Sequence, residues 1–181
     1  MRRLRVFESI SIDGYFCDAH GDIRWAHAGS DDPEYMAWVG GNASGDGALL
    51  FGRKTYDEMV AFWPTPAAAQ QLPVVARGMN AAAKYVVAHS LEPTWHNTTA
   101  LRGIEDVRQL KASEGPGITL LGSGQLAAQL GEAGLVDEYQ FVIVPIALGA
   151  GRTVFTARRE LSLVDQRTFN NGRVAVTYAA A

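Results

Sequence analysis

The sequence has a single cysteine, no excess of basic residues and no long apolar run. Cys17 alone cannot form an internal disulfide, and this usage is typical of a reducing compartment. Lysine and arginine number 16 against 19 acidic residues, so the basic stripe that nucleic-acid binding needs is absent. No apolar run approaches the roughly 20 residues of a membrane span, and the N-terminal residues lack a signal-peptide pattern. We expect a soluble, cytoplasmic protein that binds neither nucleic acid nor membranes.

A standard metal-binding pattern is also missing. Asp18, His20 and Asp22 alternate, and Cys17 lies three residues before His20. This spacing matches no standard zinc or calcium set, and the other histidines are scattered. We therefore expect no metal site.

What the chain does have is enough apolar sequence for one core. Its 181 residues are 48% hydrophobic, which suits one well-packed core and is short for two. The sequence shows no internal repeat, low-complexity tract or interdomain linker. We expect residues 1–181 to form a single domain.

The clearest local pattern begins at Gly117. The apolar run Ile118–Leu121 is bounded by glycines, which indicates a strand buried on both faces. A turn of Gly122, Ser123 and Gly124 follows, and leucines at helical spacing predict a helix over Gln125–Ala133. The free N–H groups of the first helical turn, next to two glycines, favour a pyrophosphate site.

Gly122 also opens a Gly-Ser-Gly-Gln-Leu-Ala match to the shortened dinucleotide fingerprint. A Rossmann unit would place an acid about 20 residues further on, where this chain has Val144 and Pro145. The motif also comes too late in the chain for a full doubly wound sheet. The sequence therefore argues against a Rossmann domain, and a tight turn without a ligand stays an alternative.

A second strand of this kind precedes another glycine. The apolar run Ala48–Phe51 leads into Gly52, Arg53, Lys54 and Thr55. Thr55 and Glu58 predict a capping box at the start of a helix. Free N–H groups and two cations would hold an anion, with Arg53 gripping a phosphate through its planar fork. The alternative is a solvated basic turn.

The first predicted strand, Leu4–Ile12, has an acid on its apolar face. Leu4 and Val6 share that face with Glu8. Glu8 is either a hydrogen-bonded residue at the end of the sheet or a carboxylate that lines a pocket. After Asp13, the polar segment up to Trp25 predicts a loop that folds over a ligand.

The remaining segments complete an α/β pattern. Asp32 and Pro33 predict a helix start, with Glu34 and Tyr35 in its first turn. The strand 85–88 ends at His89 and Ser90, where ligand clefts of α/β proteins lie. The other predictions are one irregular helix within 64–83, a strand over 98–101, a helix over 104–110, a strand over 138–144 and a hairpin of 161–169 and 173–178 around Asn170-Asn171-Gly172.

Three segments in this order resemble the dihydrofolate reductase superfamily. They are Ser11-Ile12-Asp13-Gly14, Phe51-Gly52-Arg53-Lys54-Thr55-Tyr56, and Leu121-Gly122-Ser123-Gly124 with the later Gly149-Ala150-Gly151-Arg152-Thr153-Val154-Phe155. The likeness covers nearly the whole chain. It is closest to stand-alone proteins grouped with the C-terminal reductase domain of the bifunctional riboflavin-biosynthesis deaminase/reductase. It implies a three-layer α/β fold with a central mixed, mostly parallel sheet and a C-terminal antiparallel hairpin.

The resemblance also implies a cofactor site for NADPH and a homodimer. Arg53 would bind the 2′-phosphate, which favours NADPH over NADH. The implied cofactor residues are Gly52, Arg53, Lys54 and Thr55 for the adenosine phosphates, His89 and Ser90 for the adenosine side, and Gly122, Ser123, Gly124 and Gln125 for the pyrophosphate.

The implied activity is hydride transfer from NADPH to a small pterin- or pyrimidine-like heterocycle, similar to the 5-amino-6-(5-phosphoribosylamino)uracil reductase domain. Glu8, Asp13 and Tyr35 are the candidate proton donors. Dihydrofolate reductases carry an acid where this chain has Tyr35, and the riboflavin-pathway domain carries a first-strand lysine that Leu4–Ile12 lacks. The alternatives are a ligand-binding module without turnover and, less favoured, a true dihydrofolate reductase.

Overall fold

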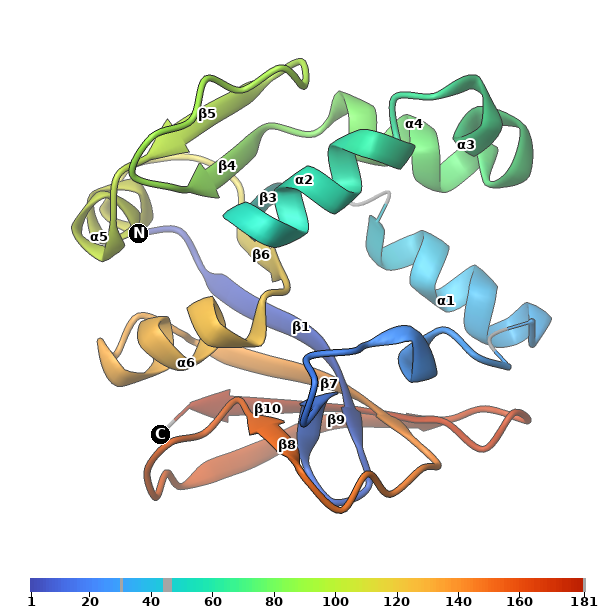
Figure 1. The fold of residues 1–181 in the computed structure, drawn as a ribbon. Helices are drawn as coiled ribbons and strands as arrows, with labels where there is room; N and C mark the ends of the chain where they lie inside the picture. Colours follow the sequence, from blue (N-terminus) through green and yellow to red (C-terminus); the bar gives the residue numbers. More distant parts are fainter. Residues whose placement is uncertain (30, 44–46, 181) are drawn as a thin grey trace.

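A computed structural model describes residues 1–29, 31–43 and 47–180. It contains an eight-stranded sheet in the order β5-β4-β3-β6-β1-β7-β10-β9. The strands from β5 to β7 in this order are parallel, whereas β10 is antiparallel to both β7 and β9. The expected mostly parallel sheet that ends in an antiparallel hairpin is thus confirmed (Figure 1).

The strands of this sheet lie close to the predicted ranges. Their bounds are β1 Leu4–Ser11, β3 Ala48–Gly52, β4 Lys84–Val87, β5 Thr98–Leu101, β6 Ile118–Leu121, β7 Glu138–Val144, β9 Leu161–Thr168 and β10 Val174–Ala180. A second, two-stranded sheet pairs β2 Tyr15–Asp18 with β8 Gly151–Thr153. The helices are η1 Arg24–Ala26, α1 Pro33–Ala43, α2 Arg53–Phe62, α3 Pro66–Gln71, α4 Pro73–Ala81, α5 Ile104–Ala112 and α6 Gly124–Glu132.

Helices cover both faces of the large sheet. On one face, α5 and α6 pack on a core that includes Val6, Leu120 and Leu130. On the other face, α2 and α4 pack over β3 and β4, and α1 packs over β7 and β10. This gives the expected three layers, and it leaves the surface of β1 and β6 between α1 and α2 without a helix of its own (Figure 1).

Three local predictions were wrong. The 64–83 segment forms two helices, α3 and α4, each with a proline in its first turn. Thr55 does not begin a capping box, because α2 starts at Arg53 with Gly52 as its N-cap and no side-chain cap bond. The 13–25 segment is not all loop, since β2 lies within it and is paired with β8.

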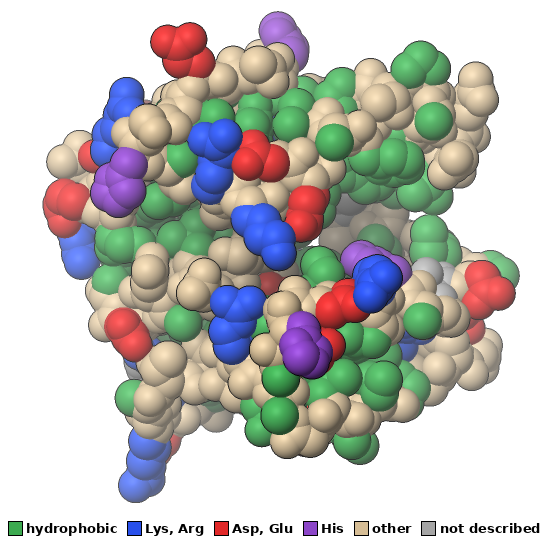
Figure 2. Space-filling model, viewed as in Figure 1, with side chains coloured by type: hydrophobic (Ala, Val, Ile, Leu, Met, Phe, Trp, Pro, Cys, Tyr) green, Lys and Arg blue, Asp and Glu red, His purple; other side chains and the backbone are tan. Residues whose placement is uncertain are grey.

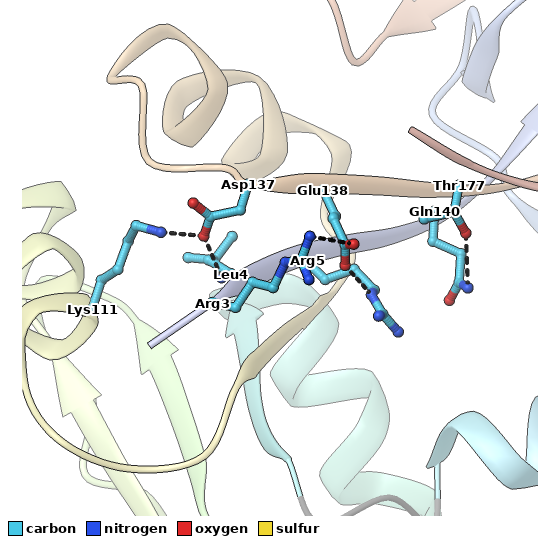
Figure 3. Close-up of polar contacts among 8 residues, drawn as sticks. All are labelled: Arg3, Leu4, Arg5, Lys111, Asp137, Glu138, Gln140 and Thr177. Atoms are coloured by element: carbon cyan, nitrogen blue, oxygen red, sulfur yellow. Dashed lines mark hydrogen bonds and ion pairs between the residues drawn. The ribbon is translucent and has the colours of Figure 1, made fainter. Parts of the chain in front are cut away.

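Buried charged residues tie the layers together. Asp137, just before β7, accepts hydrogen bonds from the backbone N–H of Leu4 and from the ammonium of Lys111 on α5 (Figure 3). Lys84, which is fully buried, donates to the carbonyl groups of Met79, Asn80 and Ala82 at the end of α4. The bonds from Lys84 satisfy carbonyl groups at the end of α4 that would otherwise lack partners.

No helix within the described ranges is long and apolar enough to span a membrane.

Candidate functional site

A step in the sheet creates a large hollow. β6 ends at Leu121, opposite Phe7, whereas β1 continues beside β7 as far as Ser11. Glu8 is therefore the first β1 residue beyond the end of β6. A pocket of about 640 Å³ opens at this step and reaches over both faces of the sheet. Figure 2 shows the hollow, with lysine and arginine side chains spread over the surface to its left.

The two predicted glycine turns meet at this pocket. β3 and β6 are parallel neighbours, so their carboxyl ends lie side by side. A β-carbon on Gly52 would lie 2.8 Å from Oγ of Ser123, and one on Gly122 would lie 3.5 Å from Oγ1 of Thr55. Both turns contribute to the lining of the pocket, through Lys54, Thr55, Gly122, Ser123, Gly124 and Gln125.

The two helix N-termini differ in what they offer a ligand. Gly52 caps α2 without a side chain, so the first N–H groups of α2 have no side-chain cap. Ser123 caps α6 and accepts a hydrogen bond from the N–H of Leu126 at 3.4 Å. Gly124 does not simply leave room for a phosphate, because a β-carbon there would lie 2.3 Å from the ring of Phe16. The glycine is needed for this packing inside the protein.

Arg53 lies beside the pocket and not in its lining. Its Nε pairs with the Asp57 carboxylate at 2.8 Å, and one terminal nitrogen donates to the carbonyl of Ser90 at 3.1 Å. The carbonyl of His89 accepts from Arg102. His89 and Ser90 are exposed. Arg53 and Ser90 thus lie together at the carboxyl edge of β3 and β4.

Glu8 projects into the pocket, whose lining also includes a second acid, Glu58 on α2. It is partly buried, and its Oε1 accepts a hydrogen bond from the N–H of Ser9 at 3.2 Å. No ion pair joins it to a lysine or arginine of the described part of the chain. Burial without a cation raises the pKa of Glu8 to about 8. At neutral pH the carboxyl group therefore carries a proton.

The other two candidate acids differ sharply from Glu8. Asp13 does not line the pocket, because its carboxylate accepts from the Ser11 hydroxyl and from the N–H groups of Leu148 and Gly149. The Ser11 hydroxyl, followed by the Gly149 N–H, lowers the pKa of Asp13 to about 2, so this residue is an ionised anchor of the 148–149 turn. Tyr35 does line the pocket, and burial raises its pKa.

Several residues that line the pocket were not predicted from the sequence. On the face opposite Glu8, Arg5 reaches the pocket floor, where its Nε pairs with the buried Glu138 at 3.0 Å. Gln140 lies nearby and accepts from Asn42 at 3.2 Å. Side-chain alternation along β1 predicts that Arg5 and Phe7 lie on the face opposite Glu8. Their partners on β7 could not be predicted, because these residues are far away along the chain.

No cluster of three or more histidine, cysteine or acidic side chains suited to a metal occurs in residues 1–29, 31–43 and 47–180.

The comparisons with known proteins agree with the fold. A family model described as "RibD C-terminal domain" matches residues 2–175. The chain belongs to the RibD C-terminal domain family. A curated relative, "Uncharacterized protein YyaP" of Bacillus subtilis (strain 168), is 26% identical over 98% of this chain and 94% of its own.

Two solved structures share the fold of this RibD C-terminal domain protein. A putative riboflavin biosynthesis protein from Shewanella sp. PV-4 superposes with a TM-score of 0.68, at 18% identity, over 99% of both chains. A pyrimidine reductase-like protein from Corynebacterium diphtheriae superposes with a TM-score of 0.65, at 14% identity, over 99% of this chain and 92% of its own. Family membership supports a reductase-like protein that resembles the riboflavin-pathway domain.

Proposed function

We propose that the protein is an NADPH-dependent reductase that reduces a C=N or C=O bond in a small flat heterocycle. The observation that carries this proposal is the position of Glu8. Its carboxyl group, whose pKa burial raises to about 8, lies in the pocket beside the meeting point of two strand–turn–helix units. A reduction of this kind needs both a site for a dinucleotide and a proton source, and residues suited to both roles line this pocket.

The residues at the two turns fit a dinucleotide. The uncapped N-terminus of α2 would hold phosphate oxygens, with Lys54 at the pocket and Arg53 outside it as the partner of the 2′-phosphate. Gly122, Ser123, Gly124 and Gln125 would contact the pyrophosphate. Thr55 lies in the first turn of α2 and also next to Gly122, so it connects the α2 residues with the pyrophosphate residues. His89 and Ser90 would border the adenosine end.

Glu8 would complete the reaction. When bound, NADPH supplies a hydride to the electron-poor carbon of the substrate. The neighbouring nitrogen or oxygen then needs a proton, which the protonated Glu8 carboxyl group donates, and solvent afterwards reprotonates the carboxylate. Tyr35 is a weaker acid in the same pocket, since burial raises its pKa. The pocket walls would limit access of water to the reacting atoms.

The test is a titration of the purified protein with NADPH and with NADH, followed by quenching of its four tryptophans. We expect saturable binding with a preference for NADPH. Absorbance of NADPH is then followed against a panel of pterins, pyrimidines and flavins. Absence of binding by either nucleotide would end the proposal, whereas tight binding with no consumption of NADPH would support a ligand-binding module without turnover.

A further inference from the structure

One end of the pocket is apolar and lies away from the proposed cofactor residues. We call it the apolar lobe and define it by Met36 and Val39 on α1, Met59, Phe62 and Trp63 at α2, and Val75 on α4. These side chains come from three helices and line one hollow above β1 and β6. All of them except Val75 are only partly buried, so a ligand that covers them would remove further apolar surface from water.

The floor of the apolar lobe carries one arginine. Glu138, whose side chain is only 4% exposed, accepts a hydrogen bond from Nε of Arg5 at 3.0 Å and forms an ion pair with Arg3 at 2.8 Å. Figure 3 shows its carboxylate between the two arginines. The terminal nitrogens of Arg5 make no hydrogen bond to any residue that the structure describes. Glu138 thus fixes the guanidinium of Arg5 and leaves its outer N–H groups for a ligand.

The lobe is poorly suited to a phosphate. The other lysine and arginine in the described pocket lining lie nearer the two glycine turns: Lys54 is in the first turn of α2, and Arg152 on β8 lies over the ring of Phe16, which packs on Gly124. Glu138 offsets only part of the charge of Arg5, because it also pairs with Arg3. A phosphate dianion would have to leave water for a mostly apolar wall, where it would meet only the partly neutralised guanidinium of Arg5 among the described lobe residues. Such desolvation of a charge is costly.

We propose that the substrate is a flat ring compound without a phosphate group. Its apolar body fills the apolar lobe, and a carbonyl or carboxylate oxygen on its edge accepts hydrogen bonds from Arg5. This inference rests on the proposed reductase function and names its substrate class. It also separates this protein from enzymes whose substrate carries a ribityl phosphate.

Lumiflavin and FMN provide a matched pair of probes. They share one ring system with two carbonyl groups, and only FMN carries a ribityl phosphate. Binding is followed by flavin fluorescence, with and without saturating NADPH. We expect lumiflavin to bind at least ten-fold more tightly than FMN, and Arg5→Met to weaken lumiflavin binding about ten-fold. Equal or tighter binding of FMN, or no binding of lumiflavin, would overturn the inference.

Two charge insertions test the lobe itself. Met59→Lys should weaken lumiflavin binding at least ten-fold and shift the preference toward FMN, and Val39→Lys should do the same from the opposite wall. Ala61→Lys is the control, because Ala61 is an exposed residue of the same helix outside the pocket lining. If folded Met59→Lys and Val39→Lys proteins bind lumiflavin like Ala61→Lys, the inference is wrong. NADPH quenching, measured in parallel, reports separately on the cofactor site.

Discussion

Oε2 of Glu8 lies 3.6 Å from the point that a β-carbon on Gly122 would occupy. The acid at the end of β1 and the turn at the end of β6 therefore border the same space. Gly122 has a φ of +59°, a conformation that residues with a side chain rarely adopt. A side chain at position 122 would be both strained and directed toward Glu8 and Thr55. This contact joins the proposed proton donor to the proposed pyrophosphate turn.

Glu8→Gln should abolish most turnover while leaving cofactor binding intact. The amide has nearly the shape of the protonated acid but does not donate its proton to substrate, so we expect a 10²–10⁴-fold loss in the rate of NADPH consumption. In the wild type the rate should fall as pH rises through about 8, where Glu8 loses its proton. An unchanged rate in Glu8→Gln, with tryptophan quenching by NADPH as the binding control, would remove Glu8 from the mechanism.

The stability of the protein should also depend on the titration of Glu8. Its pKa is raised from 4.5 to about 8 in the folded protein, so between these values the folded state holds a proton that the unfolded state has lost. The free energy of unfolding should therefore decrease as pH rises from about 4.5 to about 8, by on the order of a few kcal/mol at most. Urea unfolding across this range measures the slope. In Glu8→Gln, this part of the slope should be missing.

Arg53→Ala should reduce the preference for NADPH over NADH. Removal of the guanidinium would take one charge-assisted contact from the 2′-phosphate, so we expect NADPH to bind about 10- to 100-fold more weakly and NADH to bind almost as before. Arg108→Ala is the matched control, because Arg108 forms a similar exposed ion pair, with Glu105 on α5. Equal losses for both nucleotides would mean that Arg53 acts on the fold of the turn and not on the 2′-phosphate.

Gly124→Ala should destabilise the protein through Phe16. The added methyl group would lie 2.3 Å from the ring of Phe16, and overpacking of this kind costs about 1–3 kcal/mol. Phe16→Ala in the same chain should recover part of the loss, which double-mutant unfolding curves would show as coupling. Gly103→Ala serves for comparison, since no described atom outside its chain neighbours lies within 4 Å of its β-carbon position. Additive effects at positions 16 and 124 would contradict the packing argument.

Arg173→Lys should loosen the segment that follows η1. The buried guanidinium of Arg173 donates to the carbonyl groups of Ala26, Ala28 and Gly29. Lysine keeps the charge but lacks the planar fork, so we expect a loss of about 1–3 kcal/mol and faster amide exchange around residue 27. Arg158→Lys, at an exposed arginine, should change neither quantity. Unchanged exchange near residue 27 would show that other contacts hold this segment.

The local patterns predicted much of the secondary structure because they depend on neighbouring residues. Apolar runs marked β1, β3, β4, β6 and β7, leucines at helical spacing marked α6, and Asn170-Asn171-Gly172 marked the hairpin turn. The capping box at Thr55 failed even though its pattern was present. β3 carries the chain to Gly52, packed against Ser123, and the helix begins at once, so Thr55 already lies inside the first turn.

The sequence by itself determined the residue types: an acid on the apolar face of β1, and glycines after β3 and β6. Only the tertiary structure decided which of these residues meet, because the sheet order places β3, β6 and β1 side by side although they are distant along the chain. Glu8 acquires its raised pKa from burial at the end of β6, and Arg5 acquires its direction from Glu138 on β7. Desolvation and ion pairing depend on what surrounds a group in space, and a linear pattern does not contain that information.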